Sequence, residues 1–139
     1  MSETARARAW IYTTLMNDPV VLGLVGNRVY HAVAPADAQY PFVIFQLRSG
    51  GNDLRGVGMT RIWAEPLYLI KAICKGTSSG SIEPVVNAID AALHGKSGTV
   101  TNGVIVECFR ERPFELPTDE NGTMYMQLGG EYHFRVQQA

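Results

Sequence analysis

The feature that most constrains the fold is a run of four apolar residues, F-V-I-F at positions 42–45, directly after Pro41. Side chains of a strand alternate between its two faces, so apolar residues on both faces indicate a strand covered on two sides. Proline at the head of a strand does little harm, because its missing N–H is not needed there. The sequence therefore predicts a central β-strand at residues 41–47.

A shorter strand and a loop precede this run. Gly26 and Asn27 form a turn, and residues 28–33 follow as a strand. Residues 34–40 contain a proline and read as the loop between the two strands.

This stretch also carries a family resemblance. Residues 25–46 contain the runs V-G-N-R-V-Y, A-V-A-P and, after a short polar spacer, Y-P-F-V-I-F-Q. These runs resemble the signature of the phage tail completion and tail terminator family. Looser similarity continues at residues 67–74, 88–93 and 132–136. The signature describes a fold and a role, and it contains no catalytic motif.

The resemblance implies a structural virion protein at the junction of head and tail, assembled in the host cytoplasm. Six copies would form a closed ring that caps the tail tube protein and presents the tail side of the interface to the head–tail connector protein. DNA would pass through the lumen without sequence-specific binding. The resemblance implies neither an enzyme nor a cofactor.

Length and composition are consistent with one domain at residues 1–139. Hydrophobic residues make up 46% and charged residues 18% of the chain, which excludes a disordered protein. The net charge of −1 gives no general attraction to nucleic acid. The N-terminus lacks the apolar region of a signal peptide, and no apolar run reaches the ~18 residues of a membrane span. We expect Cys74 and Cys108 to be buried, reduced thiols in strands.

The first helix is predicted at residues 3–16, with Ser2 as its N-cap. Spacings of three and four residues define an inward face, with two arginines toward solvent. The inward residues would be Ala9, Trp10, Tyr12, Thr13 and Met16, and the outward arginines Arg6 and Arg8.

Two further helices have start signals. Asp18 and Pro19 open a short helix that ends at Gly26 or Asn27, with an apolar edge of Val20, Val21, Leu24 and Val25. Ser81 would cap a third helix that ends at His94 and Gly95. Its apolar stripe consists of Ile82, Val85, Val86, Ile89, Ala92 and Leu93.

The remaining strands are divided by glycine and proline. Residues 50–58, with four glycines, are predicted to be a long flexible loop. Residues 60–75 form a strand in which Tyr68, Ile70, Ala72 and Cys74 share one face. Pro66 interrupts this strand and places residues 61–65 at an edge or a bulge.

The C-terminal third predicts more strands. Asn102-Gly103 is a hairpin turn, followed by a strand over residues 104–112. Residues 117–122 are predicted as a loop, and Gly129-Gly130 separates strands at 124–128 and 131–137. Strands grouped apart from helices predict an α+β fold, an antiparallel or mixed sheet with N-terminal helices and one mid-chain helix packed on it.

Two sets of residues are candidates for function. The long loop and the strand after it supply interface candidates, because apolar side chains there have no obvious partner within the chain. These candidates are Leu54, Arg55, Val57, Met59, Arg61 and Trp63. A flexible hairpin beside a proline-protected edge is the alternative interpretation.

The acidic residues Glu107, Glu111 and Glu115 are candidates for the lumen of a ring. Repeated around the ring, they would repel DNA and let it slide through. The alternative is a solvated strand face.

Other chemistries find little support in the sequence. His31, His94 and His133 have no second ligand at a metal-binding spacing, and Gly95-Lys96-Ser97 follows a helix where a phosphate-binding loop would precede one. The serines match no nucleophile elbow. The alternatives to a tail terminator are a head–tail adaptor or minor capsid protein, or a small α+β ligand-binding domain.

Overall fold

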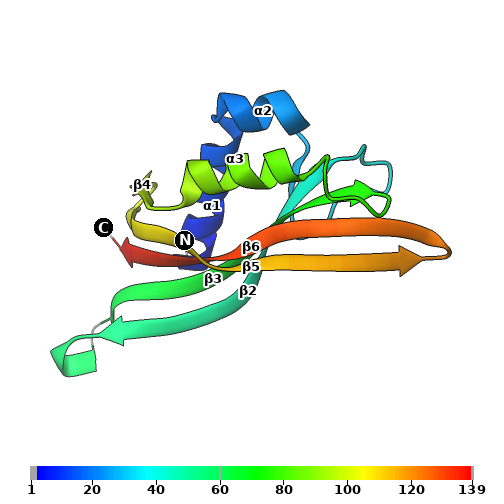
Figure 1. The fold of residues 1–139 in the computed structure, drawn as a ribbon. Coiled ribbons are helices and arrows are strands. Elements are labelled where there is room, and N and C mark those ends of the chain that lie inside the picture. The colour runs from blue at the N-terminus through cyan, green and yellow to red at the C-terminus, as the bar shows by residue number, and fades with distance from the viewer. Residues whose placement is uncertain (1–2, 60, 139) are drawn as a thin grey trace.

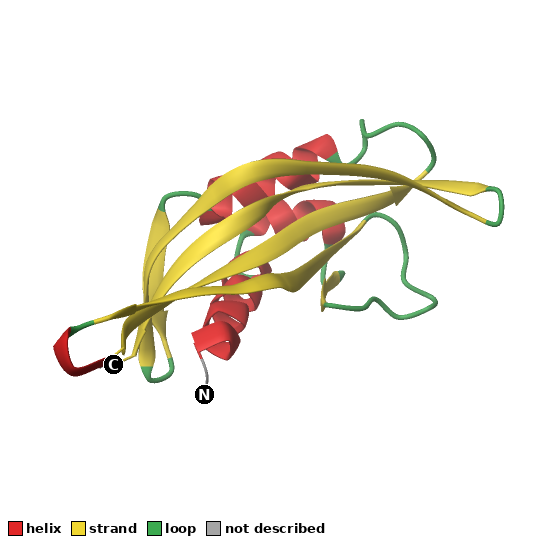
Figure 2. Cartoon of the chain, turned by 90° about the horizontal axis from the view of Figure 1, so that it is seen from below, coloured by secondary structure: helices red, strands yellow, loops and turns green. Residues whose placement is uncertain are grey.

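A computed structural model describes residues 3–59 and 61–138, without the side chains at positions 52, 54, 59, 61, 62 and 138. The described residues form three α-helices, a short 3-10 helix and a six-stranded sheet (Figures 1 and 2). The helices are α1 (Glu3–Met16), α2 (Pro19–Val25), η1 (Val57–Met59, the 3-10 helix) and α3 (Glu83–Leu93). The strands are β1 (Val29–His31), β2 (Phe42–Arg55), β3 (Arg61–Lys75), β4 (Lys96–Val100), β5 (Gly103–Glu120) and β6 (Thr123–Gln138).

The sheet is mixed, with the strand order β1-β2-β3-β6-β5-β4. β1 pairs with β2 in parallel, and the other neighbouring strands pair antiparallel. The predicted α+β class with an antiparallel or mixed sheet is therefore confirmed. The four long strands occupy the middle of the sheet, and the two short ones lie at its edges.

The main core lies between the three helices and one face of the sheet, and the other face is open (Figures 1 and 2). Burying a large apolar side chain contributes roughly 1.5–3 kcal/mol. The strand alternation predicted for β3 is confirmed, because Tyr68, Ile70, Ala72 and Cys74 all belong to this core. Both cysteines are buried and free, as expected.

The first part of β2 is covered on both faces, as its sequence predicts. Val43 and Phe45 face the helices in the main core. Phe42 and Ile44 lie on the open face, where they form a second cluster with Ile73. That cluster is covered by side chains from β1 and the following loop, namely Tyr30, Ala34 and Ala38.

The inward face of α1 differs from the prediction. The buried residues are Arg6, Ala7, Trp10, Ile11 and Leu15, whereas Tyr12 is 46% exposed. Arg6 was expected in solvent but is 3% exposed, because its stem packs where Gly103 leaves room. A Cβ at Gly103 would lie 2.5 Å from Cδ of Arg6. The predicted Ser2 cap lies outside the described residues.

Asp18 caps α2 as predicted. Its Oδ1 accepts hydrogen bonds from the backbone N–H groups of Val20 and Val21, at 2.9 and 3.1 Å. Val21 and Val25 are fully buried. Val20 and Leu24 were expected on the same apolar edge, but they face outward, because a helix of two turns presents one narrow side to the core.

The third helix begins two residues after the predicted Ser81 cap. Its N-cap is Ile82, since the carbonyl of Ser79 accepts the N–H groups of Ile82 and Glu83 in a preceding turn. The predicted apolar stripe is confirmed, with Ala92 half-buried at its margin. His94 and Gly95 end the helix as expected, and Gly95 adopts a φ of +75°.

The predicted loop at residues 50–58 is wrong for its first six residues, because β2 continues to Arg55, and right for residues 56–58, which form the hairpin tip. The glycine-rich segment forms a bulge in the strand, with register shifts between Ser49 and Asn52. Gly51 is required there, since it has a φ of +68° and a Cβ would lie 1.6 Å from the carbonyl oxygen of Glu65. Glycine is used here for close approach of two strands.

Pro66 lies opposite this bulge, inside a continuous β3. The expected bulge at residues 61–65 is confirmed, because the pairing of β3 with β2 shifts register between Leu54 and Arg55. The expected sheet edge there is wrong. Ala64 pairs with Asp53 of β2 and with Val136 of β6, so β3 has neighbours on both sides there.

β5 and β6 form one long hairpin. The predicted loop at residues 117–122 is strand up to Glu120, and the turn is Asn121-Gly122, with φ of +53° and +84°. The predicted break at Gly129-Gly130 is also wrong. A Cβ at Gly129 would lie 2.1 Å from the carbonyl oxygen of Ile70, so glycine here brings β6 close to β3 without interrupting it.

The edge strand β4 was not predicted, and it moves the neighbouring turn by one residue. The turn is Thr101-Asn102, and Gly103 already belongs to β5. β4 pairs with β5 as far as Cys108. Farther along, the outer edge of β5 carries Pro113 and Pro117, whose spacing of four residues turns both nitrogens to the same side of the strand.

Candidate assembly surface

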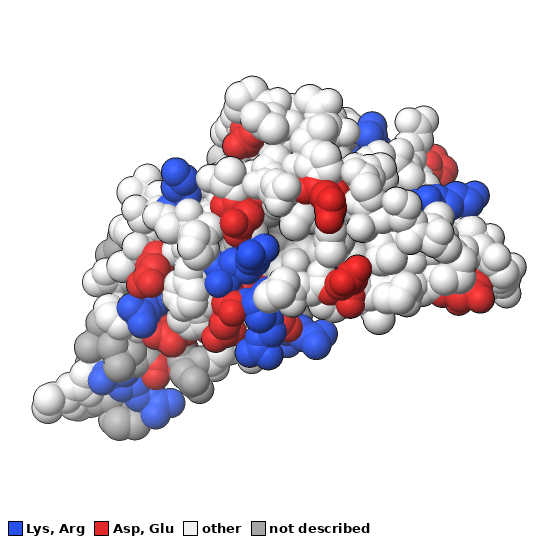
Figure 3. Space-filling model, in the orientation of Figure 1, with Lys and Arg blue, Asp and Glu red and all other residues white. Residues whose placement is uncertain are grey.

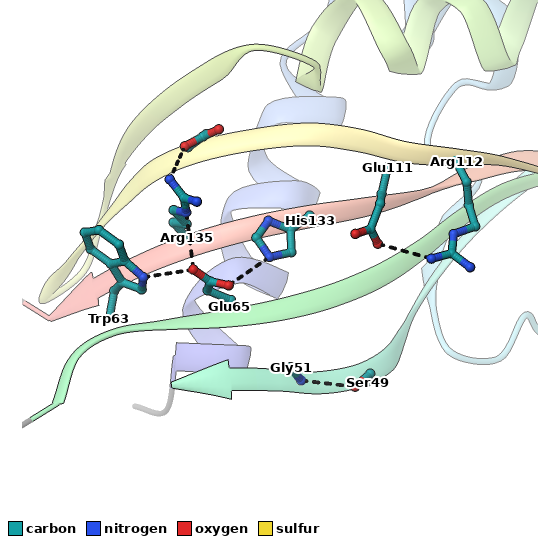
Figure 4. Close-up of polar contacts among 9 residues, drawn as sticks. Ser49, Gly51, Trp63, Glu65, Glu111, Arg112, His133 and Arg135 are labelled. Atoms are coloured by element: carbon teal, nitrogen blue, oxygen red, sulfur yellow. Dashed lines mark hydrogen bonds and ion pairs between the residues drawn. The ribbon is translucent and has the colours of Figure 1, made fainter. Parts of the chain in front are cut away.

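The open face of the sheet carries a network of charged and aromatic side chains centred on Glu65 (Figure 4). Its Oε1 accepts from the indole N–H of Trp63 at 3.0 Å and lies 3.3 Å from Nε of Arg135. Its Oε2 lies 3.3 Å from Nε2 of His133. Arg135 reaches further to Glu107, at 2.9 Å, and its guanidinium lies over the Trp63 ring. This network joins β3, β5 and β6 across the sheet.

Glu65 is charged at neutral pH. Burial opposes its charged form, but the hydrogen bond from Trp63 and the neighbouring His133 and Arg135 outweigh burial and lower the pKa of Glu65. A hollow of about 290 Å³ lies next to it, lined by Ser49, Gly51, Glu65, Leu67, Glu111 and His133.

A second network is centred on Glu131, which is 6% exposed. Its carboxylate lies 3.1 Å from Nε of Arg48 and 2.9 Å from Nε of Arg112. Arg112 also approaches Glu111, at 3.7 Å. A buried charge needs such partners, because an unpaired one is costly away from water. Figure 3 shows charges of both signs gathered over the strands, below a mostly uncharged helical layer.

The predicted interface residues lie at the tip of the β2–β3 hairpin and just behind it. Val57 in η1 is fully exposed, and Arg55 is exposed at the end of β2. Trp63 is half-buried in the Glu65 network. The side chains of Leu54, Met59 and Arg61 lie outside the described part of the structure.

The predicted lumen residues do not share one face of β5. Glu107 and Glu111 lie on the open face, where each is close to an arginine. Phe114 also faces this side, under the ammonium group of Lys71. Strand alternation therefore turns the next residue, Glu115, to the opposite face, where it is exposed.

At the end of the sheet near the β5–β6 turn, the open face is hollowed by a groove of about 370 Å³. Aromatic rings form its wall, with Tyr40 5.1 Å from Phe42 and 5.6 Å from Tyr125 between ring centroids. Burial raises the pKa of Tyr40, aided by its hydrogen bond to Tyr125 and the charge of Glu120. The remaining lining residues are Ile73, Thr118, Asp119, Glu120 and Gln127.

Sequence reasoning missed the groove and the Glu131 network. Both are assembled from residues far apart in the chain, and Tyr40 and Tyr125 come together through the packing of a loop against a hairpin. One signal in the sequence could have indicated the Glu131 network. Glu131 is a charged residue next to buried positions of β6, so it would need charged partners.

The described residues contain no cluster of three or more His, Cys, Asp or Glu side chains that could hold a metal ion. Among the helices described, none is long and apolar enough to cross a membrane.

Comparison with known proteins places this fold in a family. The chain matches the family described as "Tail completion protein gp17" over residues 9–129. It therefore belongs to that family, as the signature at residues 25–46 implied, and it is a structural protein of the bacteriophage virion tail.

Solved structures share the fold at low sequence identity. One is a chain of the "Virion of native gene transfer agent (GTA) particle", with a TM-score of 0.76, 19% identity and 98% of each chain covered. A second solved protein gives a TM-score of 0.59 at 11% identity, with 96% of each chain covered. The search of curated proteins found no match.

Proposed function

We propose that this chain caps the tail tube as a closed ring and forms the tail side of the head–tail interface. Membership of the tail completion family over residues 9–129 carries the proposal. The fold shared with a chain of a gene transfer agent virion, over 98% of both chains, supports it. The chain would act as a single tail-terminator-like domain over residues 1–139.

The mechanism would be binding geometry and would involve no catalysis. Copies of the chain, six in the proposed ring, would associate head to tail, and assembly would stop because the rotation closes. The two long hairpins project beyond the helix-covered core at opposite ends (Figure 1). Projecting strands suit contacts with neighbours, with the tail tube protein and with the connector protein of the head.

The passage of DNA through the lumen stays a prediction. Glu107 and Glu111 already contact arginines, so the open face carries charges of both signs. Such a face would hold DNA weakly, since few cations are free to release counterions on contact. Glu115 would contribute to the lumen only if the helix-covered side also faced inward.

The proposal is tested in a phage whose gene for this chain is deleted and supplied from a plasmid. We expect complemented particles to show a ring of this protein between tail tube and head by cryo-electron microscopy. Uncomplemented lysates should contain filled heads and unjoined tails. A location on the head side of the junction would favour the adaptor alternative. Normal particles without the protein would overturn the proposed function.

A further inference from the structure

The tip of the β2–β3 hairpin presents an exposed valine close to an exposed arginine. Val57 lies in η1 with its whole side chain exposed, and Gly58 holds the turn with a φ of +82°. Arg55 is exposed at the end of β2, two residues after the exposed Asp53. A fully exposed valine at the end of a hairpin buries nothing within its own chain, so it gains from contact with a partner.

The groove at the other end of the sheet has the complementary character. Its floor and wall are apolar and aromatic, formed by Tyr40, Phe42, Ile73 and Tyr125. Its rim is acidic, because Asp119 and Glu120 are both exposed at the end of β5. An apolar pocket with an acidic rim fits an exposed valine that has an exposed arginine, Arg55, close by.

The positions of these two features exclude contact within one molecule. The β2–β3 tip and the β5–β6 turn beside the groove lie at opposite ends of the sheet (Figures 1 and 2). A projection at one end and a matching recess at the other define a heterologous contact between copies. Repetition of such a contact gives a ring when its rotation closes.

We propose that the β2–β3 tip of one copy, with Val57 at its centre, inserts into the groove of Tyr40, Phe42, Ile73 and Tyr125 on the next copy. Arg55 pairs there with the acidic rim. This inference rests on the proposed function and names the contact by which the ring closes.

The direct test is disulfide cross-linking in purified phage particles. A variant with Val57→Cys and Thr118→Cys places one thiol on the tip and one in the groove. After mild oxidation we expect a ladder of cross-linked dimers and larger species on a non-reducing gel. Each single-cysteine variant is the matched control and should stay monomeric, since Cys74 and Cys108 are buried.

Mixed particles sharpen this test. Particles containing both single-cysteine variants should give dimers and nothing larger, because each chain carries one reactive thiol. Dimers from Val57→Cys alone would mean that two tips meet each other, and this would overturn the proposal.

Charge reversal tests the same contact independently. Arg55→Glu and Glu120→Arg should each lower incorporation into particles by about tenfold, and co-expression of the two variants should restore it. When the two variants alternate in the ring, each altered tip meets an altered groove and each unaltered tip meets an unaltered groove. Glu83→Arg, at an exposed acidic position of α3 outside the tip and the groove, is the control and should incorporate normally. Failure of the mixture to recover would contradict the pairing.

Different outcomes would overturn the proposed function and the tip-in-groove contact. If the wild-type protein is absent from the head–tail junction, the proposed function and this inference both fall. If the double-cysteine variant is incorporated there but forms no cross-link, the tip-in-groove contact is wrong and the proposed function stands.

Discussion

The long strands have two kinds of environment, a part covered by helices and a part that projects. Under the helices, Tyr132, Phe134 and Val136 of β6 are at most 1% exposed. In the projecting part of the same hairpin, Leu116 of β5 is 43% exposed although its backbone pairs regularly with β6. The comparison separates two tasks. Burial under the helices supplies stability, and the ladder of backbone hydrogen bonds beyond them supplies shape.

The largest expected effect tests this separation directly. Phe134→Ala should lower the free energy of unfolding by about 3–5 kcal/mol, because Phe134 is fully buried against Trp10 and Tyr68. Phe114→Ala removes the same group from the projecting hairpin and should cost about 1 kcal/mol. Urea denaturation of both variants measures the difference. Equal losses would show that the projecting hairpin is part of the same stabilising core.

A smaller effect is expected at the bulge, where a projecting strand depends on a local contact. Gly51→Ala should destabilise the protein by about 2 kcal/mol, since its Cβ would overlap the carbonyl of Glu65 and its φ is positive. Gly50→Ala is the matched control, because a Cβ there meets nothing within 4 Å. It should change stability by less than about 0.5 kcal/mol. Thermal unfolding would rank the two, and similar midpoints would rule out the bulge geometry.

The smallest effect concerns the Glu65 network and depends on pH. The folded state lowers the pKa of Glu65, so its contribution is present above the unfolded pKa and is lost as pH falls through the folded value. Glu65→Gln should therefore cost about 1 kcal/mol at pH 7, and this difference should shrink below about pH 4. Trp63→Phe, which removes one donor, should show part of the effect. A loss independent of pH would contradict the assignment of the charge.

The sequence predicted the covered part of the fold better than the projecting part. A continuous apolar run identified the start of β2, because that part is covered on both faces. Alternation identified β3 and apolar spacing identified α3, because burial on one side leaves a periodic pattern. Gly51, Gly129 and Pro117 were interpreted as strand breakers, yet each lies in a continuous strand. Pairing with long neighbouring strands outweighed the low strand propensity of these residues. The glycines are required where two backbones approach closely.

The candidate site was predicted less completely. Leu54 and Val57 were identified from the sequence as apolar residues without an obvious partner in the chain, and Arg55 as an interface candidate. The structure leaves Arg55 and Val57 exposed. The groove could not be predicted, because Tyr40, Ile73 and Tyr125 meet through tertiary packing alone. The burial of Arg6 was hidden for the same reason, since it depends on the absence of a side chain at the distant Gly103.

Pro113 and Pro117 have a consequence for the outer edge of β5. An unpaired strand edge is a template on which identical chains can stack into fibrils. Prolines at two sites on the outer side of β5 remove two N–H donors from that edge. A second copy therefore cannot pair along it with a full set of backbone hydrogen bonds.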